Sequence, residues 1–423
     1  MKSKSIKQSH HTGIRLTTLG VCLGATVAGI GSLHAQTADA GRLEKLEQEN
    51  ADLKKRLDTL EAVAQKEGIL TDGGAANKTL TFLGGSTLSG FVTSSYFYDM
   101  SNPPDNVSHG YLWSRNDGSF AINKVELKLA RPAVVSGDKW DAGYNVIMIW
   151  GQDAQFVNTG PSSIKGFDSL RQAFVELNVP IGNGLDVKAG QLISLLNFES
   201  GDGGAANPNF SQGNQWFFTG NGPAAGVQAS YTFNPVIDFS ARVQNGLFTG
   251  AIDGNGYKTL MGSLGIKPDD KTGINLIGFG GREGSSTSEW LKGGSVIASR
   301  KFADTYGLTA ATEFDYFSAD TAGGSADWWS IGGWLWADFT PSFGAALRGD
   351  YINDEKGAGT SGLLGFPVNS GQELFSLTGT LNFHPLASIK IQPEVRYEHT
   401  TLEGAFGGHK DRVILGMGAS YLF

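Results

Sequence analysis

The sequence predicts an all-β protein, an antiparallel transmembrane β-barrel of about 16 strands, preceded by a short α-helical coiled coil. Sixteen segments from about residue 86 onward alternate apolar and polar residues with a period of two. The connections between these segments alternate between short and long. Glycine (60 of 423 residues) and aromatic residues (11%) are both frequent, which suits many strands joined by tight turns.

Residues 1–35 are expected to be a secretory signal peptide. A basic leader precedes an apolar core, and "LHA" before Gln36 is an acceptable cleavage site. A membrane-anchored start is the alternative. Removing this segment takes away four basic and no acidic residues, which shifts the formal net charge from -8 to -12. The acidic balance argues against nucleic acid as a partner and favours transport of cations over anions.

Residues 36–67 predict a coiled-coil stalk, and a glycine-containing linker follows at 68–85. Leucines recur at alternating spacings of three and four, which forms a heptad seam, and "RLDTLE" resembles the signature of short trimeric coiled coils. Such a stripe is buried only when copies meet, so we expect a parallel homotrimer. A helix lying on the protein's own surface is the alternative. The predicted trimer stalk consists of Leu43, Leu46, Asn50, Leu53, Arg56, Leu57, Leu60 and Glu61.

The strand pattern of residues 86–423 indicates a barrel in a membrane. "FAINKVELKLARP" alternates three apolar with three charged residues, and the charged face cannot meet lipid. "WDAGYNVIMIW" carries aromatic residues near both ends, as interfacial belts require. Each segment is close to the length that a tilted spanning strand needs, about 9 to 11 residues.

The connections and the C-terminus indicate a bacterial outer membrane. Short connections such as "PIGNG" alternate with long ones such as "SNPPDNVSHGYLWSRNDGS", as periplasmic turns and outer loops do. A stalk before the first strand then lies in the periplasm. The chain ends in "VILGMGASYLF", whose last residue, Phe423, resembles the C-terminal recognition signature of outer-membrane barrels. Outer-membrane lipid and the barrel-insertion machinery are therefore expected partners.

Over roughly residues 86–423 the chain resembles the OmpL-like beta-barrel porin family. The recurring pieces are a glutamine and an aromatic residue in the fourth strand, "GNGLDVKAGQ" at the next hairpin, and "VQNG" before a loop. The resemblance implies an outer-membrane channel for small solutes and carries over no catalytic residues. A stalk followed by a barrel is also similar in architecture to trimeric porins with periplasmic coiled coils.

We therefore expect a water-filled channel for passive diffusion of small hydrophilic solutes or ions. On each strand, the positions that alternate with the apolar ones are expected to face the lumen. Acidic and basic side chains at these positions could set a transverse electric field across the lumen. The alternative for each is a merely solvated lumen residue. The pore-lining candidates are Lys124, Glu126, Lys128, Glu313, Asp315, Arg348, Asp350, Lys390, Glu394 and Arg396.

Two further segments attract functional hypotheses. Residues 195–223 form the longest break between strands, and we expect this third outer loop to fold into the pore, with Glu199 and Asp202 as constriction acids. "DWWSIGGWLWADF" places four tryptophans on one strand. An interfacial belt or a trimer contact is the favoured interpretation, and stacking on sugar rings inside the channel is the alternative.

Two other classes of function compete with the channel. An outer-membrane hydrolase is disfavoured because His109, His384, His399 and His409 lie in no recognisable nucleophile or metal motif, so no enzyme activity, metal or cofactor is expected. The stronger rival is a structural anchor that tethers the outer membrane to peptidoglycan through the coiled coil. A nonconducting barrel would favour that rival.

Overall fold

The computed structural model describes residues 48–59, 62, 85–154, 169–202, 206–247, 253, 255–283, 289–302, 305–321 and 324–423. The chain divides into two compact units, Met1–Phe82 and Leu83–Phe423. No helix in the described part of the chain is long and apolar enough to cross a membrane.

In the first unit, residues 48–59 are helical. This helix includes four of the predicted stalk residues, and the leucines among them are exposed in the single chain. These four are Asn50, Leu53, Arg56 and Leu57. The other four, Leu43, Leu46, Leu60 and Glu61, lie outside the described residues, as do residues 1–35. Assembly of the stalk into a trimer stays a prediction.

The second unit is built from sixteen strands in the described part of the chain. They are β1 (Thr87–Asp99), β2 (Ser119–Arg131), β3 (Asp141–Trp150), β4 (Leu170–Val179), β5 (Leu185–Leu192), β6 (Ala224–Thr232), β7 (Ile237–Gln244), β8 (Thr259–Asp269), β9 (Thr272–Arg282), β10 (Trp290–Lys301), β11 (Thr309–Thr321), β12 (Gly324–Thr340), β13 (Phe343–Asp354), β14 (Gln372–Leu386), β15 (Ile389–Thr400) and β16 (Asp411–Leu422). A short helix, α4 (Asn214–Phe218), lies between β5 and β6, and a 3-10 turn, η1 (Thr305–Gly307), precedes β11.

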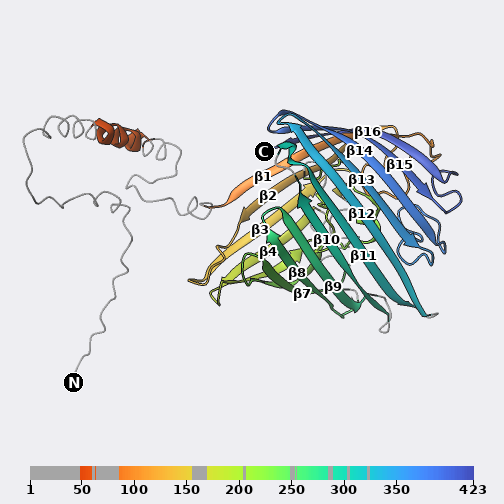
Figure 1. Cartoon of the computed structure of the whole chain (residues 1–423), viewed down its shortest axis with the longest axis horizontal. Helices are drawn as coiled ribbons and strands as arrows, with labels where there is room; N and C mark the ends of the chain where they lie inside the picture. Colours follow the sequence, from red (N-terminus) through yellow and green to blue (C-terminus); the bar gives the residue numbers. More distant parts are fainter. Residues whose placement is uncertain are drawn as a thin grey trace, which may run out of the picture. The chain divides into compact units, whose positions relative to one another are not determined.

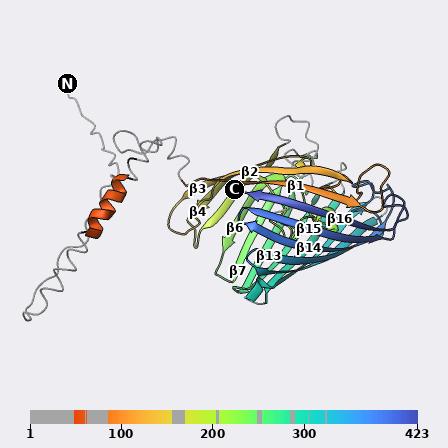
Figure 2. The same ribbon diagram turned by 90° about the horizontal axis from the view of Figure 1, so that it is seen from above.

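Each strand pairs antiparallel with its neighbours in sequence, and β1 pairs with β16, so the sheet is a closed barrel. Figures 1 and 2 show β1 in orange beside β16 in blue, with the tilted strands continuing around the wall. The predicted antiparallel barrel of about sixteen strands is confirmed. Closure matters because it leaves no sheet edge with unpaired backbone groups, which lipid cannot satisfy.

The end of the chain takes part in this closure. The backbone N–H of Gly90 donates to the carbonyl of Phe423 at 2.9 Å, and the N–H of Phe423 donates back to Gly90 at 3.1 Å. A side chain on Gly90 would meet the Glu126 carbonyl, and its Cβ would lie 2.8 Å from the Phe423 ring. The seam between first and last strand therefore needs a glycine opposite the terminal phenylalanine.

The connections have the predicted asymmetry in most places. One end of the barrel has short turns such as 270–271, 341–342 and 387–388, and most connections at the other end are long loops. Two connections differ most from this pattern: residues 322–323 alone join β11 to β12 on the long-loop end, and residues 132–140 join β2 to β3 on the short-turn end. β11 and β12 therefore form one hairpin whose tip lies at the long-loop end.

We expect a larger side chain at Gly90, where β1 pairs with β16, to destabilise the barrel. Gly90→Val should lower the free energy of unfolding by about 1–3 kcal/mol, because the added methyl groups collide with the Glu126 carbonyl and the Phe423 ring. Urea unfolding in detergent micelles, followed by the gel shift between folded and unfolded protein, measures this loss. Gly278→Val on β9 is the control, since a Cβ there has no neighbour within 4 Å. Equal losses in both variants would contradict a special role for the seam.

Candidate functional site in the barrel lumen

Charged side chains gather on the inner face of the barrel. Along the strands, apolar residues such as Leu127, Phe314 and Leu347 are exposed on the outside, and their neighbours point inward. All ten pore-lining candidates lie on the inner face, where nine are buried and Lys128 is half-buried. They are Lys124, Glu126, Lys128, Glu313, Asp315, Arg348, Asp350, Lys390, Glu394 and Arg396. Their role in lining a pore stays a prediction.

An irregularity in β2 changes the expected alternation. The register with β1 shifts between Thr93 and Ser94, so that Asn123 has no partner on β1. Asn123 and Lys124 are consecutive, yet both are buried. A β-bulge explains this, because the extra residue rotates the strand by one position. β2 therefore contributes an amide and an ammonium group to the lumen at the same level.

The described residues between β5 and β6, 193–202 and 206–223, lie inside the barrel, and we call them the inserted segment. Its described residues form hydrogen bonds with side chains from opposite parts of the wall: Lys124 on β2, Arg242 on β7, Asp315 on β11 and Glu394 on β15. A segment that reaches strands all around a closed barrel must occupy its lumen. The segment that we expected to be the third outer loop therefore contacts the inner wall, and its role in transport stays a prediction.

Two carboxylates on β11 bind the beginning and the end of the inserted segment. Glu313 accepts hydrogen bonds from the backbone N–H groups of Asn197 and Phe198 at 3.0 and 2.8 Å. Asp315 accepts from the side chains of Gln215 and Thr219 at 2.8 and 2.9 Å. Both acids are almost fully buried, so these donors replace the water that a buried carboxylate would otherwise lack.

Glu199 of the inserted segment forms a buried ion pair with the wall. Its carboxylate lies 2.8 Å from the Arg348 guanidinium on β13 and also accepts from the Trp334 indole at 3.2 Å. The N–H of Gly213 donates to the other carboxylate oxygen at 2.7 Å. Removing one partner of such a pair leaves an uncompensated buried charge. Glu199 therefore fastens the segment to the wall and does not face open water.

Residues of β14 and β15 hold the middle of the inserted segment. Glu394 accepts from the backbone N–H of Phe210 at 3.0 Å and from that of Ser211 at 3.3 Å. The Ser211 hydroxyl also donates to Glu394, and Thr380 donates to it at 2.9 Å. Arg396 donates to the Gln212 carbonyl at 2.8 Å. The backbone polar groups of this irregular stretch are thus satisfied by the barrel wall, as burial requires.

Asp202 links the inserted segment to the other side of the barrel. Its carboxylate lies 2.8 Å from the Arg171 guanidinium on β4, and its carbonyl accepts from the Lys124 ammonium at 3.1 Å. The segment therefore spans from the wall at β11–β15 to the wall at β2–β4. The two acids proposed as constriction acids, Glu199 and Asp202, are both neutralised by arginines.

Apolar contacts add to these polar ones. Leu195, Leu196 and Phe198 of the inserted segment pack against a cluster on β8–β12 that includes Phe317 and Trp328. The favoured interpretation of the β12 tryptophans as a membrane belt or trimer contact is wrong for three of them, Trp328, Trp334 and Trp336, which share the inner face of the strand. Trp328 and Trp334 point inward and are buried, with their indole N–H groups bonded to the Phe218 carbonyl and to Glu199. These two rings anchor the inserted segment.

Near the long-loop end, charged side chains and aromatic rings stack against one another beside β1, β15 and β16. Arg412 on β16 pairs with Glu398 at 2.6 Å and with Asp99 at 3.3 Å. The Tyr111 ring lies 4.1 Å from the Arg396 guanidinium and 5.1 Å from that of Arg412. Burial raises the pKa of the Tyr111 phenol well above its usual value, so the ring is neutral between the two cations.

One part of the wall keeps contact with water. Across β5–β9 the inner face carries polar side chains that are half-buried or exposed in the barrel. They are Lys188, Ser230, Ser240, Ser263 and Asn275. The lumen therefore has two unlike walls, since the inserted segment covers β11–β15, whereas β5–β9 are covered only in part and retain exposed polar groups.

Several residues of the site were not anticipated from the sequence. The amide side chains of Asn209, Asn214 and Gln215 in the inserted segment bond to Thr380, Glu398 and Asp315 on the wall. The stretch "NPNFSQGNQ" is rich in such amides, and that composition was an available signal for a buried polar loop. Arg412 pairs with residues distant in sequence, and no local pattern indicates that.

Comparison with protein families identifies one match. A family model described as "Putative beta-barrel porin-2, OmpL-like" matches residues 85–423, which is the whole barrel unit. A search of curated protein sequences finds no match.

Solved structures with similar folds are outer-membrane proteins. The barrel is similar to an anion-selective porin from Comamonas acidovorans, with a TM-score of 0.54 and 10% identity over 80% of this chain and 99% of that one. It is also similar to the outer membrane channel DcaP of Acinetobacter baumannii (TM-score 0.51, 13% identity, 80% and 97% covered). A third is OmpT of Vibrio cholerae, described as a trimer form (TM-score 0.53, 10% identity, 80% and 99% covered). At these identities the likeness concerns the fold.

Glu394 offers a test of how the inserted segment is held. Glu394→Leu leaves the N–H groups of Phe210 and Ser211 without their acceptor, and each buried donor left unpaired costs about 1–3 kcal/mol. We expect the inserted segment to open and chymotrypsin to cleave it at its aromatic residues at least about tenfold faster. Glu403→Leu is the control, because that acid lies in an exposed loop and pairs with Lys410 only. Unchanged cleavage in folded Glu394→Leu protein would show that this anchor is dispensable.

Proposed function

The chain belongs to the OmpL-like family of beta-barrel porins, and from this premise we propose that it forms a water-filled channel across the bacterial outer membrane. Small hydrophilic solutes or ions diffuse through it passively. The proposal rests on the difference between the two sides of the inner wall, one covered by the inserted segment and the other with exposed polar groups. A sixteen-strand barrel is wide enough for an aqueous lumen, and the inserted segment narrows it from one side while polar groups of β5–β9 stay exposed on the other.

Charge at the constriction supports a mild preference for cations. The chain has 41 acidic and 33 basic residues, and four of the basic ones precede residue 36. In the lumen most charges are paired, as Glu199 is with Arg348 and Asp202 with Arg171. Paired charges of both signs on facing walls order water across the channel and favour polar solutes over apolar ones. The net excess of acids then gives cations the advantage.

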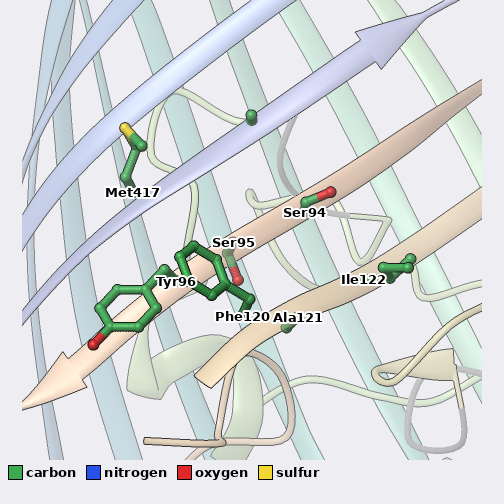
Figure 3. A pocket seen from close by; sticks show the side chains of 8 residues that line it. Ser94, Ser95, Tyr96, Phe120, Ala121, Ile122 and Met417 are labelled. Atoms are coloured by element: carbon green, nitrogen blue, oxygen red, sulfur yellow. The ribbon is translucent and has the colours of Figure 1, made fainter. Parts of the chain in front are cut away.

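We also propose that the channel is a homotrimer with β1, β2 and β16 at its contact. Phe120 projects from β2 with 87% of its surface exposed. Beside it lies a hollow of about 350 Å³, which includes Ser94, Ile122, Met417 and Ala419 in its lining. Figure 3 shows the Phe120 ring next to Tyr96 at the edge of this hollow, and the two ring centroids are 4.9 Å apart.

A second copy of the chain fits this surface. The hollow beside Phe120 is lined by serines and alanines together with Ile122 and Met417, so Phe120 of one protomer could enter the hollow of the next, and repetition by threefold rotation closes the ring. The predicted stalk precedes β1 with only the linker of residues 68–85 between them, so a trimeric stalk would favour the assembly of three barrels. One structurally similar protein, OmpT of Vibrio cholerae, is described as a trimer form.

The two ends of the chain have proposed roles outside the lumen. The C-terminal Phe423 is half exposed and lies at the seam of the barrel, where insertion machinery could bind it before closure. The stalk at residues 36–67 would lie in the periplasm, within reach of peptidoglycan. Deletion of the stalk is expected to leave conduction intact, because all lumen contacts described above involve residues after 85.

Recording from purified protein in planar bilayers tests the channel. We expect stepwise conductance in groups of three and a reversal potential under a KCl gradient that shows a mild preference for cations, because the chain as a whole has an excess of acids. Protein shown to be folded by gel shift but silent across the voltage range would refute the proposal. It would also revive the structural anchor as the better explanation.

Substitution of Phe120 tests the proposed contact. Phe120→Lys places a charge where an aromatic ring is expected to be buried, so we predict dissociation into monomers in mild detergent. Leu347→Lys is the matched control, since Leu347 is 47% exposed on the outer face of β13, away from β1. Light scattering coupled to size exclusion gives the mass of each. A trimer that survives Phe120→Lys would place the contact elsewhere on the barrel.

A further inference from the structure

The lumen contains a cavity of about 410 Å³ beneath the inserted segment, at the end with short turns, which we call the turn-side cavity. Its wall residues Asp338, His384 and Lys390 lie close to the turns at 341–342 and 387–388. Asn207 of the inserted segment forms part of its roof. A solute that passes the inserted segment would meet this cavity next, so the inference rests on the proposed channel.

One side of the turn-side cavity is aromatic. Phe198 and Trp336 both line it and are half-buried. The Phe198 ring centroid lies 5.8 Å from that of Trp336 and 4.8 Å from that of the buried Trp334, which fixes Phe198 in place. Aromatic rings that keep a free face can pack against the apolar C–H face of a ligand.

The other side offers both donors and acceptors. Lys390 donates to the Asn207 carbonyl at 2.7 Å, which holds its ammonium in place and leaves two N–H donors. The Asp338 carboxylate is exposed and has no hydrogen-bond partner among the described residues. It faces Gly344 on β13, where a Cβ would come within 2.6 Å of its oxygen. The glycine therefore makes room for the carboxylate at the cavity wall.

The charges of the cavity balance. Among its lining residues, Asp338 is the only acid and Lys390 the only lysine or arginine, so the formal net charge is zero when His384 is neutral. Such a site has no net attraction for an ion of either sign. It does have what a neutral ring with several hydroxyl groups needs, because hydroxyls both donate and accept while the ring's C–H face packs on an aromatic surface. We propose that the turn-side cavity binds a neutral sugar in transit.

The test combines binding with ion current. Maltose and glucose are titrated against the full chain, first in detergent by isothermal titration and tryptophan fluorescence, then in planar bilayers by reduction of the KCl current. We expect saturable binding in the millimolar range, and a weakening of about tenfold for Trp336→Ala and for Asp338→Ala. Trp329→Ala is the matched control, because Trp329 lies on the same strand with its side chain on the outer face.

The outcomes separate this inference from the proposed function. Channels that conduct without sugar binding would overturn the inference and leave the channel intact. Equal weakening by Trp329→Ala and Trp336→Ala would overturn the assigned cavity, and so would binding of glycylglycine or acetate in place of sugar. Sugar binding lost in Trp336→Ala but kept in Trp329→Ala would support the site even if no current were seen, in which case the channel itself would fail.

Discussion

The buried charges of the inner wall must be paired, and the inserted segment supplies the partners. Glu313, Asp315 and Glu394 would be costly in a dry lumen, yet each accepts hydrogen bonds from the segment. Arg348 gains a carboxylate from it. The dependence is mutual, since the segment has little regular structure of its own and relies on the wall to satisfy its backbone. Closure of the barrel makes this possible, because a closed wall surrounds the segment on all sides.

The proposed function depends on the part of the inner wall that the segment leaves uncovered. The segment covers β11–β15 and reaches Arg171 on β4, so in the proposed channel the aqueous path would run along β5–β9. A passing solute would meet serines, Asn275 and Lys188 on that side. The aromatic and charged residues that meet it on the far side are those of the turn-side cavity. Selectivity would then depend on side chains that the segment leaves uncovered, and most charges of the lumen would act by fixing the width of the channel.

Local sequence predicted the wall well and its contents poorly. Alternation at period two gave all sixteen strands and the inward parity of residues such as Arg348 and Glu394. Their partners in the inserted segment lie more than 100 positions away, as Glu199 does from Arg348, and no periodicity encodes such a pair. β12 shows the limit most clearly. Tryptophan occurs on both of its faces, because the inner face packs against Phe198 and Phe317, so composition alone could not tell lipid from lumen.

We propose that the inserted segment, held by the wall charges, sets the width of the channel. The most direct measurement compares the single-channel conductance of the intact chain with that of a chain lacking residues 200–214, both shown to be folded. Deletion removes the contacts to Glu394 and Arg396 and the chain that spans the lumen, so conductance should rise severalfold. An unchanged conductance would contradict the claim, because the solute path would then lie outside the reach of the segment.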